Sequence, residues 1–381
     1  MQELPPQTCK NQWFFFIMGK IKYTKNTEQY WKDRSYHATE MGLKSSDELL
    51  KEMKKLYEDS YTSIEKEINA FYGKYAKDNS LSFEEVNKRL NTQELKSFKK
   101  ETNAYYNKIN SLYKKGKISK ELLYKYRNEL RELSAKSYIS RLEYIKSSMR
   151  NQLIEMGGKE YGLFTEKFKE NIGQFHLQES YNADMTKGFS TGFSPYSKQD
   201  VDKLLNERWL GENYSDRIWK NKSKLVESLN NDLMKGIALG WNPNKTAKLI
   251  QESYQTSLYN CERLARTETI HLLNSVTEDT YKEHGIEKYQ FVCDLSERTC
   301  PECGALDGQV FNLKDKVEGV NYPVIHPNCR CTTIPYFEKD EIDEMFEESS
   351  RVAYDGEGKI YEVPSSMSYN DWLDLVKGKQ K

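Results

Sequence analysis

The side chains with the clearest potential for chemistry in this sequence are its cysteines. Five of the seven lie within 39 residues: Cys293, Cys300, Cys303, Cys329 and Cys331. Cys300 and Cys303 have the C-x2-C spacing, which places two thiolates on one tight turn at adjacent corners of a tetrahedron. After an interval of 22 residues, the segment from His326 to Cys331 can supply further ligands from a second loop. The spacing predicts a metal site.

Zinc is the ion that these side chains favour, because soft sulfur ligands at tetrahedral spacing prefer Zn2+ to Mg2+ or Ca2+. Cys300, Cys303 and Cys329 are the first choices as ligands, and His326 and Cys331 compete for the fourth position. Four protein ligands leave no position for water, so we expect a structural zinc that lets a short, loop-rich unit fold. Two alternatives stay open: a redox disulfide, which a reducing cytoplasm disfavours, and unligated cysteines in a small core.

A carboxylate upstream of the cysteines also has potential for chemistry. Glu268 falls on the apolar face of a helix expected over residues 257–284. A buried carboxylate needs a cation, and Arg298 or Arg330 can supply one as a bidentate ion pair. Alternatively, Glu268 and His271 form an acid/base pair beside an open zinc. The sequence disfavours this reading, because neither a nucleophile nor a phosphate-binding glycine loop accompanies them.

The first part of the chain has the periodicity of long amphipathic helices. Apolar side chains recur every three or four residues from Leu49 to Tyr75, which is the spacing of one helix face. Ser45 and Glu48 form a capping-box pattern at the expected start of this helix.

Further helices are expected before a glycine pair. Ser82, Thr92 and Ser119 are placed to begin three of them, and Gly157-Gly158 is expected to end the last. Residues 40–156 therefore predict an antiparallel bundle or a set of projecting helices.

The pattern changes twice after residue 156. Residues 157–213 are rich in Gly, Ser, Asn and Tyr and are interpreted as a linker region. Helical periodicity then returns, and Asn242-Pro243 is a helix-start signature. Short strand patterns follow at residues 289–293, 310–311 and 332–335. The predicted class is α+β: mainly long amphipathic helices in the N-terminal two thirds, and a small zinc-stabilised α+β module near the C-terminus.

Length and composition exclude several classes of protein. The 381 residues suit two or three domains, and a hydrophobic fraction of 37% with 13% aromatics suits amphipathic helices rather than disorder. The longest apolar run, Trp13 to Met18, is short against the roughly 20 residues of a membrane-spanning helix. It is also short for a signal peptide and precedes no small-residue cleavage site. We therefore expect a protein made and kept in a cytoplasm.

The charge distribution is uneven although the formal net charge is zero. Residues 88–160 hold 18 basic and 8 acidic residues, whereas residues 338–381 hold 6 basic and 12 acidic ones. The basic segment favours an alternative function as a zinc-containing DNA-binding protein. The net charge of zero disfavours this function. The basic residues are explained more simply as the solvent-exposed faces of helices. Its candidate nucleic-acid contacts are Lys96, Lys99, Lys100, Lys114, Lys115 and Lys117.

The order of several short motifs resembles a known family. Arg266-Thr267-Glu268, Cys300-x-x-Cys303, Leu306-Asp307-Gly308 and His326-Pro327-x-Cys329-Arg330-Cys331 follow as in the Mu F-like minor head (head morphogenesis) proteins of tailed bacteriophages and prophages. Upstream segments also resemble Gram-positive phage and prophage members, so the resemblance covers roughly residues 28–337. In many relatives Arg and His stand where this chain has Cys300 and Cys303, which makes Cys303 the firmer ligand.

The resemblance implies a minor capsid protein that is not an enzyme. It implies action in procapsid assembly near the portal, and in DNA packaging or ejection. The implied partners are the portal protein, scaffold or major capsid protein, and phage DNA, with neither a membrane nor a small-molecule substrate. The implied location is the virion, in the capsid interior or at the portal vertex, and the host cytoplasm during assembly. A metallohydrolase or toxin domain fused to a head protein is a further alternative.

Periodicity, composition and the resemblance together give the expected domain boundaries. Residues 1–29 form an N-terminal extension, because the family pattern begins near Tyr30. This extension either precedes the true start, with Met18 as the start codon, or docks on a partner. A helical arm or bundle is expected at 30–156, a linker at 157–213, a Mu F-like domain with a zinc knuckle at 214–337, and an acidic tail at 338–381.

Overall fold

Helices dominate the computed structural model, which describes residues 28–187, 194–336, 350–354 and 360–364. The helical elements are α2 (Glu28–Tyr75), α3 (Phe83–Asn87), α4 (Thr92–Lys114), α5 (Lys120–Ala135), α6 (Arg141–Lys187), α7 (Lys198–Asn206), η1 (Trp209–Gly211), α8 (Tyr214–Ala238), α9 (Pro243–Glu283), α10 (Pro301–Leu306) and η2 (Leu313–Asp315). The strands are β1 (Lys288–Val292), β2 (Val310–Asn312), β3 (Thr332–Pro335), β4 (Ser350–Tyr354) and β5 (Ile360–Pro364). The expected class, long helices with a small α+β module, is confirmed. Within the described ranges, no helix is both long and apolar enough to cross a membrane.

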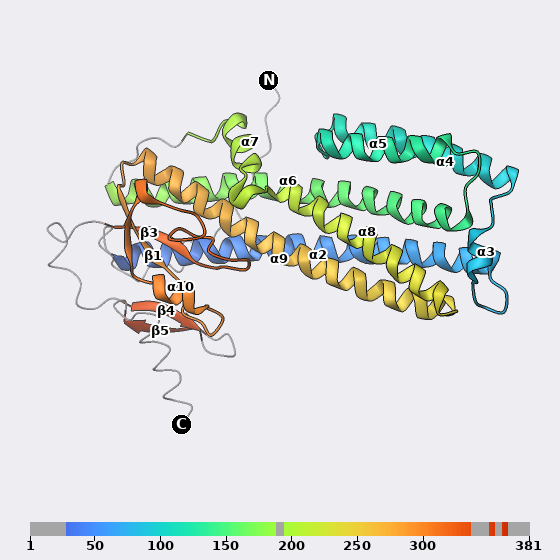
Figure 1. Cartoon of the computed structure of the whole chain (residues 1–381). Coiled ribbons are helices and arrows are strands. Elements are labelled where there is room, and N and C mark those ends of the chain that lie inside the picture. The colour runs from blue at the N-terminus through green and yellow to red at the C-terminus, as the bar shows by residue number, and fades with distance from the viewer. Residues whose placement is uncertain (1–27, 188–193, 337–349, 355–359, 365–381) are drawn as a thin grey trace, which may run out of the picture.

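Four long helices, α2, α6, α8 and α9, pack side by side along one continuous apolar core (Figure 1). The predicted stripe between Leu49 and Tyr75 lies in this core, where Met53, Ile64 and Ile68 are fully buried. α2 has 48 residues and is therefore about 72 Å long at 1.5 Å per residue. The helices thus form a long scaffold.

Two expected helix boundaries are wrong. The helix with the Leu49 stripe begins at Glu28, and Ser45 lies inside it, where its Oγ donates a hydrogen bond to Asn171 Oδ1 at 2.5 Å. Likewise, the helix begun by Asn242-Pro243 continues without a break to Glu283. In both cases packing along neighbouring helices extends the element past a local cap signal. The predicted caps at Ser82 and Ser119 are confirmed, whereas Asn91 rather than Thr92 caps α4.

The glycine pair at 157–158 does not end its helix, because α6 continues to Lys187. A Cβ on Gly157 would lie 2.6 Å from Trp219 Cζ3, and one on Gly158 would lie 2.8 Å from Leu112 Cδ2. These glycines therefore allow close approach of α8 and α4 to α6. Residues 157–187 are helix rather than linker, and residues 194–213 hold α7 and η1.

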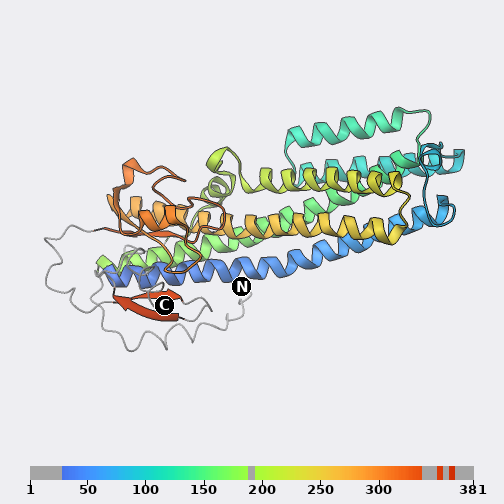
Figure 2. The same ribbon diagram turned by 60° about the horizontal axis from the view of Figure 1, so that its bottom comes forward.

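The α4–α5 hairpin forms a satellite core with α6 and α8, built from residues that include Ile109, Leu123, Ile154 and Trp219. Trp219 fixes the hairpin further, because its Nε1 donates to the carbonyl of Lys117 at 3.2 Å. Figures 1 and 2 both place this hairpin along one half of the long helices and the β1–β3 sheet at the opposite end of them.

The C-terminal module contains a three-stranded antiparallel sheet in the order β2-β1-β3. Gln290 on β1 pairs with Val310 on β2 and with Ile334 on β3. All three strands match those predicted from the sequence. The sheet packs against α2 and α9, and Tyr30, Val292 and Ile334 share a buried cluster there. In the expected acidic tail, β4 and β5 form a hairpin beside α2, whereas the N-terminal extension up to residue 27 lies outside the described residues.

Candidate metal centre

The C-x2-C pair lies at the start of α10. Cys300 is the N-cap of this helix, and its Sγ accepts a hydrogen bond from the backbone N–H of Cys303 at 3.3 Å. Pro301 occupies the first turn, where its missing N–H costs no hydrogen bond. The local sequence therefore turns both sulfur atoms toward the same side of the chain.

The second loop brings its donors to this pair. His326 Nε2 lies 3.2 Å from Cys300 Sγ and 3.3 Å from Cys303 Sγ, and Cys303 and Cys329 have their sulfur atoms 3.8 Å apart. The donors form two groups of three that share Cys303: Cys300, Cys303 and His326, and Cys303, Cys329 and Cys331. Within each group the ligand atoms lie within 4.8 Å of one another. All five predicted ligands are thus gathered around Cys303, and this cluster could hold a metal ion.

Mutual contacts shift the pKa values of the buried thiols in this cluster. Hydrogen bonds from Cys303 and Cys331 lower the pKa of the Cys329 thiol far below its usual range. The same contacts, together with burial, raise the pKa of Cys331 well above its usual value. Cys303, Cys329 and Cys331 thus lie in direct contact with one another. A divalent cation would stabilise the thiolate form of all of them.

The loop from His326 to Cys331, here called the ligand loop, is fixed to α9 through its backbone. The N–H of Asn328 donates to Thr267 Oγ1 at 3.0 Å, and Asn274 Nδ2 donates to the carbonyl of Cys331 at 3.3 Å. Asn328 has a φ of +64°, a left-handed conformation that asparagine tolerates better than most residues. The position of Cys329 is therefore set by α9 as well as by the loop.

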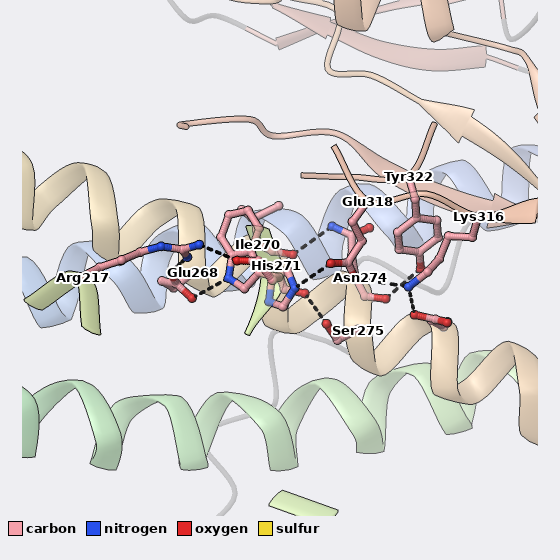
Figure 3. Close-up of polar contacts among 11 residues, drawn as sticks. Arg217, Glu268, Ile270, His271, Asn274, Ser275, Lys316, Glu318 and Tyr322 are labelled. Atoms are coloured by element: carbon pink, nitrogen blue, oxygen red, sulfur yellow. Dashed lines mark hydrogen bonds and ion pairs between the residues drawn. The ribbon is translucent and has the colours of Figure 1, made fainter. Parts of the chain in front are cut away.

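Glu268 is buried at 4% exposure, as its place on the apolar face predicts, but its cation is not one of those expected (Figure 3). Arg217 of α8 forms an ion pair with Glu268 Oε1, and Trp209 Nε1 donates to Oε2 at 3.0 Å. Arg217 also lies over the Trp209 ring, 4.1 Å from its centroid. The expected pairing with Arg298 or Arg330 is wrong, because both line the cavity at the cysteines and Arg330 faces Asp294 at 3.9 Å.

His271 extends this polar network toward the β2–β3 loop (Figure 3). Its ring stacks on Trp209 with centroids 4.5 Å apart, and its Nε2 lies 3.7 Å from Glu318 Oε2. Burial raises the pKa of Glu318, but hydrogen bonds and charge from His271 and Lys316 outweigh this and lower it to about 2. Glu268 thus contacts Trp209 and Arg217, and His271 contacts Trp209 and Glu318; neither lines the cavity at the cysteines. This arrangement favours a structural role over an acid/base pair.

Sequence reasoning missed Trp209 and Arg217 as part of this network. The available signal was Arg217 within the segment from Ser215 to Trp219, which belongs to the family resemblance. No periodicity could connect that segment to Glu268, because Arg217 and Glu268 are 51 residues apart in the sequence and lie on different helices.

The six candidate nucleic-acid contacts lie on α4 or in the turn that follows it, and the carbonyl of Lys117 accepts a hydrogen bond from Trp219 near the start of α8. Lys96, Lys100, Lys114 and Lys115 are exposed, and Lys99 and Lys117 are half-buried. None of these six lysines lines the cavity at the cysteines.

Comparison with known families places the metal centre in a recognised domain. Residues 227–334, from within α8 to β3, match the family described as phage Mu protein F like protein. The chain contains a Mu F-like domain. Its matched residues include Glu268, His271 and all five candidate ligands. The resemblance seen in the motifs is thereby confirmed for this part of the chain.

Two curated relatives share parts of the chain. An uncharacterised protein of Haemophilus influenzae is 26% identical over 168 residues, which is 44% of this chain and 37% of the relative. The NAD(+)--arginine ADP-ribosyltransferase EFV of Enterococcus faecalis is 24% identical over 206 residues, which is 50% of this chain and 40% of that protein. The chain thus spans about two fifths of the length of these relatives. No solved structure matches it significantly.

Proposed function

We propose that this Mu F-like protein is a minor capsid component that acts in phage head morphogenesis, and that its C-terminal module is a docking unit stabilised by zinc. The cysteine and histidine cluster inside the matched domain carries the proposal. We place the protein in the virion and in the host cytoplasm during assembly. Its proposed partners are the portal protein and the scaffold or major capsid protein.

The donor geometry suits zinc. With Zn–S bonds of about 2.3 Å, two sulfur atoms at adjacent corners of a tetrahedron lie about 3.8 Å apart. Cys303 and Cys329 have this separation. Five donors lie in two groups of three that share Cys303, and we propose that four of them fill every coordination position of a structural zinc.

A zinc ion with four protein ligands, and a Glu268 already paired with Arg217, favour a structural role over a catalytic one. An ion with four protein ligands has no position for water or substrate. The ADP-ribosyltransferase name belongs to a relative of which this chain matches 40%, and we do not extend that activity to this chain.

The shape of the molecule is consistent with a role in assembly. The β1–β3 sheet lies at one end of the long helices, and the α4–α5 hairpin lies along their other half (Figure 2). Such a rigid spacer can hold two docking surfaces at a fixed distance in a particle.

Fractionation of phage particles tests this function. We expect the wild-type protein in procapsids or mature heads, and we expect a Cys329→Ser phage to incorporate much less of it. Cys261→Ser is the matched control, because Cys261 is buried in the helical core away from the cluster. Absence of the wild-type chain from both procapsids and heads would contradict the proposal.

A second candidate function is DNA binding by the α4–α5 hairpin. None of the six candidate lysines makes an ion pair with a described residue, and the exposed Tyr113 directly precedes Lys114. If all six contact phosphates, log Kd should change with log salt with a slope of about five. Neutralising the six should remove this dependence, and no binding at low salt would contradict this function.

A further inference from the structure

A groove lies between α8, α9 and the ligand loop, next to the metal centre. It encloses about 380 Å³, which is within the range of roughly 300 to 1,000 Å³ typical of ligand sites. Arg217 and Glu268 line it on the helical side, and Ile325, His326 and Pro327 line it on the loop side. A molecule in this groove would contact both the long helices and the C-terminal module.

The side chains that line the groove carry more positive than negative charges. Glu268 is paired with Arg217, and Glu212 is paired with Lys220 at 2.8 Å. Lys224 and Arg263, both exposed, line the same groove, and neither has a carboxylate partner among the described residues. The guanidinium of Arg263 donates a hydrogen bond to the side-chain oxygen of Asn260 at 3.1 Å. The groove therefore presents two cations to a ligand.

The rim of the groove is apolar and strained. Leu210 is 65% exposed and has φ 51° and ψ 35°, a left-handed conformation that is unusual for a leucine. Leu264, Ile325 and Pro327 continue this apolar lining. Strain of this kind is often retained at binding sites, where the exposed side chain has a function that a relaxed residue would not provide.

We propose that this groove binds a segment of a partner protein that presents an acidic side chain beside a large apolar one. Lys224 and Arg263 pair with the carboxylate of the acidic side chain. Leu210 and its apolar neighbours cover the apolar side chain. The combination favours a peptide over nucleic acid, because two cations are few for a phosphate backbone and no exposed aromatic ring lines the groove to stack a base. This inference rests on the proposed function for the identity of the partner.

Peptide binding to the purified full chain tests the proposal. The probe is an array of short fluorescein-labelled peptides that combine Asp or Glu with Leu, Ile or Phe at different spacings, measured by fluorescence anisotropy. Control peptides replace the acidic residues by amides or the apolar ones by serine, and an oligothymidylate of equal charge is measured in parallel. We expect the acidic–apolar peptides to bind more tightly than all three controls.

Variants locate the binding. Lys224→Glu with Arg263→Glu should weaken it at least about tenfold, a change of about 1.4 kcal/mol, whereas Lys248→Glu, an exposed charge reversal elsewhere on α9, should leave it unchanged. Leu210→Gly should weaken binding and also raise the melting temperature, because glycine relieves the left-handed strain. Loss of binding together with gained stability separates a binding role from a structural one.

Three results would overturn the inference: no array peptide binding to the wild-type protein, equal weakening by Lys248→Glu, or tighter binding of the oligothymidylate than of any peptide. None of these results would bear on whether the protein is incorporated into phage particles. Failure of the groove and failure of the proposed function are therefore distinguishable.

Discussion

The helical bundle and the C-terminal module are stabilised in different ways. In the bundle, one apolar core runs the length of α2, α6, α8 and α9, so its stability is distributed over many side chains. In the module, the strands have three to five residues, and three of the proposed ligands form much of the small core. The difference teaches that the bundle should survive the loss of any single contact, whereas the module depends on one cluster.

Polar contacts modify this contrast. The bundle buries Lys222 and Glu160 almost completely, with Lys222 Nζ 2.8 Å from Glu160 Oε2. Lys222 also contacts the hydroxyl of Tyr57, so α2, α6 and α8 meet at one charged point. The bundle thus has one site at which a single substitution should be costly.

The largest expected effect is the loss of a metal ligand. Cys303→Ser should unfold the segment from about residue 290 to 337 and leave the long helices folded, because structural zinc contributes on the order of 10 kcal/mol to small domains. Limited proteolysis with far-UV circular dichroism measures this, with Cys261→Ser as the control. Unchanged protease resistance of the segment would show that the module does not depend on the cluster.

The next effect sharpens the account of the bundle. Lys222→Met should lower the free energy of unfolding by about 3 to 5 kcal/mol, because it leaves Glu160 buried without a cation. Adding Glu160→Gln should recover much of this loss. Urea titration measures both variants, and a loss below about 1 kcal/mol for the single variant would be too small for a buried charge.

A pH-dependent effect is expected where the bundle meets the sheet. Burial raises the pKa of Glu179 to about 7, although the charge of Arg34 opposes this. The folded state therefore holds a proton that the unfolded state releases between about pH 4.5 and 7, so this group lowers stability as the pH rises through that window. Glu179→Gln should raise the free energy of unfolding by up to about 3 kcal/mol at pH 8 and by little at pH 4.5. Thermal unfolding at both pH values checks this, and an equal gain at both would contradict it.

The smallest effects concern two glycines of α6. Gly157→Ala should destabilise the bundle by about 1 to 3 kcal/mol, because its Cβ meets the Trp219 ring. Gly173→Ala is the matched variant on the same helix, with no heavy atom within 4 Å of the added Cβ. It should stabilise the protein by up to about 1 kcal/mol through helix propensity. Changes of the same sign in both variants would contradict the close-packing role of Gly157.

Local features of the fold could be predicted from the sequence, and features set by packing could not. The caps at Ser82 and Ser119 and the strand at β1 depend on neighbouring residues, so their patterns sufficed. Gly157 has the same composition signal as a helix end, and only the approach of Trp219 from another helix explains its place inside α6.

The candidate site shows the same division. The C-x2-C spacing and the second group of donors predicted a cluster, because ligand spacing within a loop is a local property. The partner of Glu268 required knowledge of which helix packs on α9, and the two arginines expected from the cysteine motifs, Arg298 and Arg330, were the wrong ones. Burial of Glu268 was predictable from periodicity, whereas the identity of its cation was not.

Metal analysis of the purified, untagged protein tests the central claim most directly. We predict about one zinc ion per chain by elemental analysis, with the thiols of Cys303 and Cys329 unreactive toward a thiol reagent until a chelator is added. Protein that contains no bound metal, and whose cluster thiols react freely in the native state, would contradict the account.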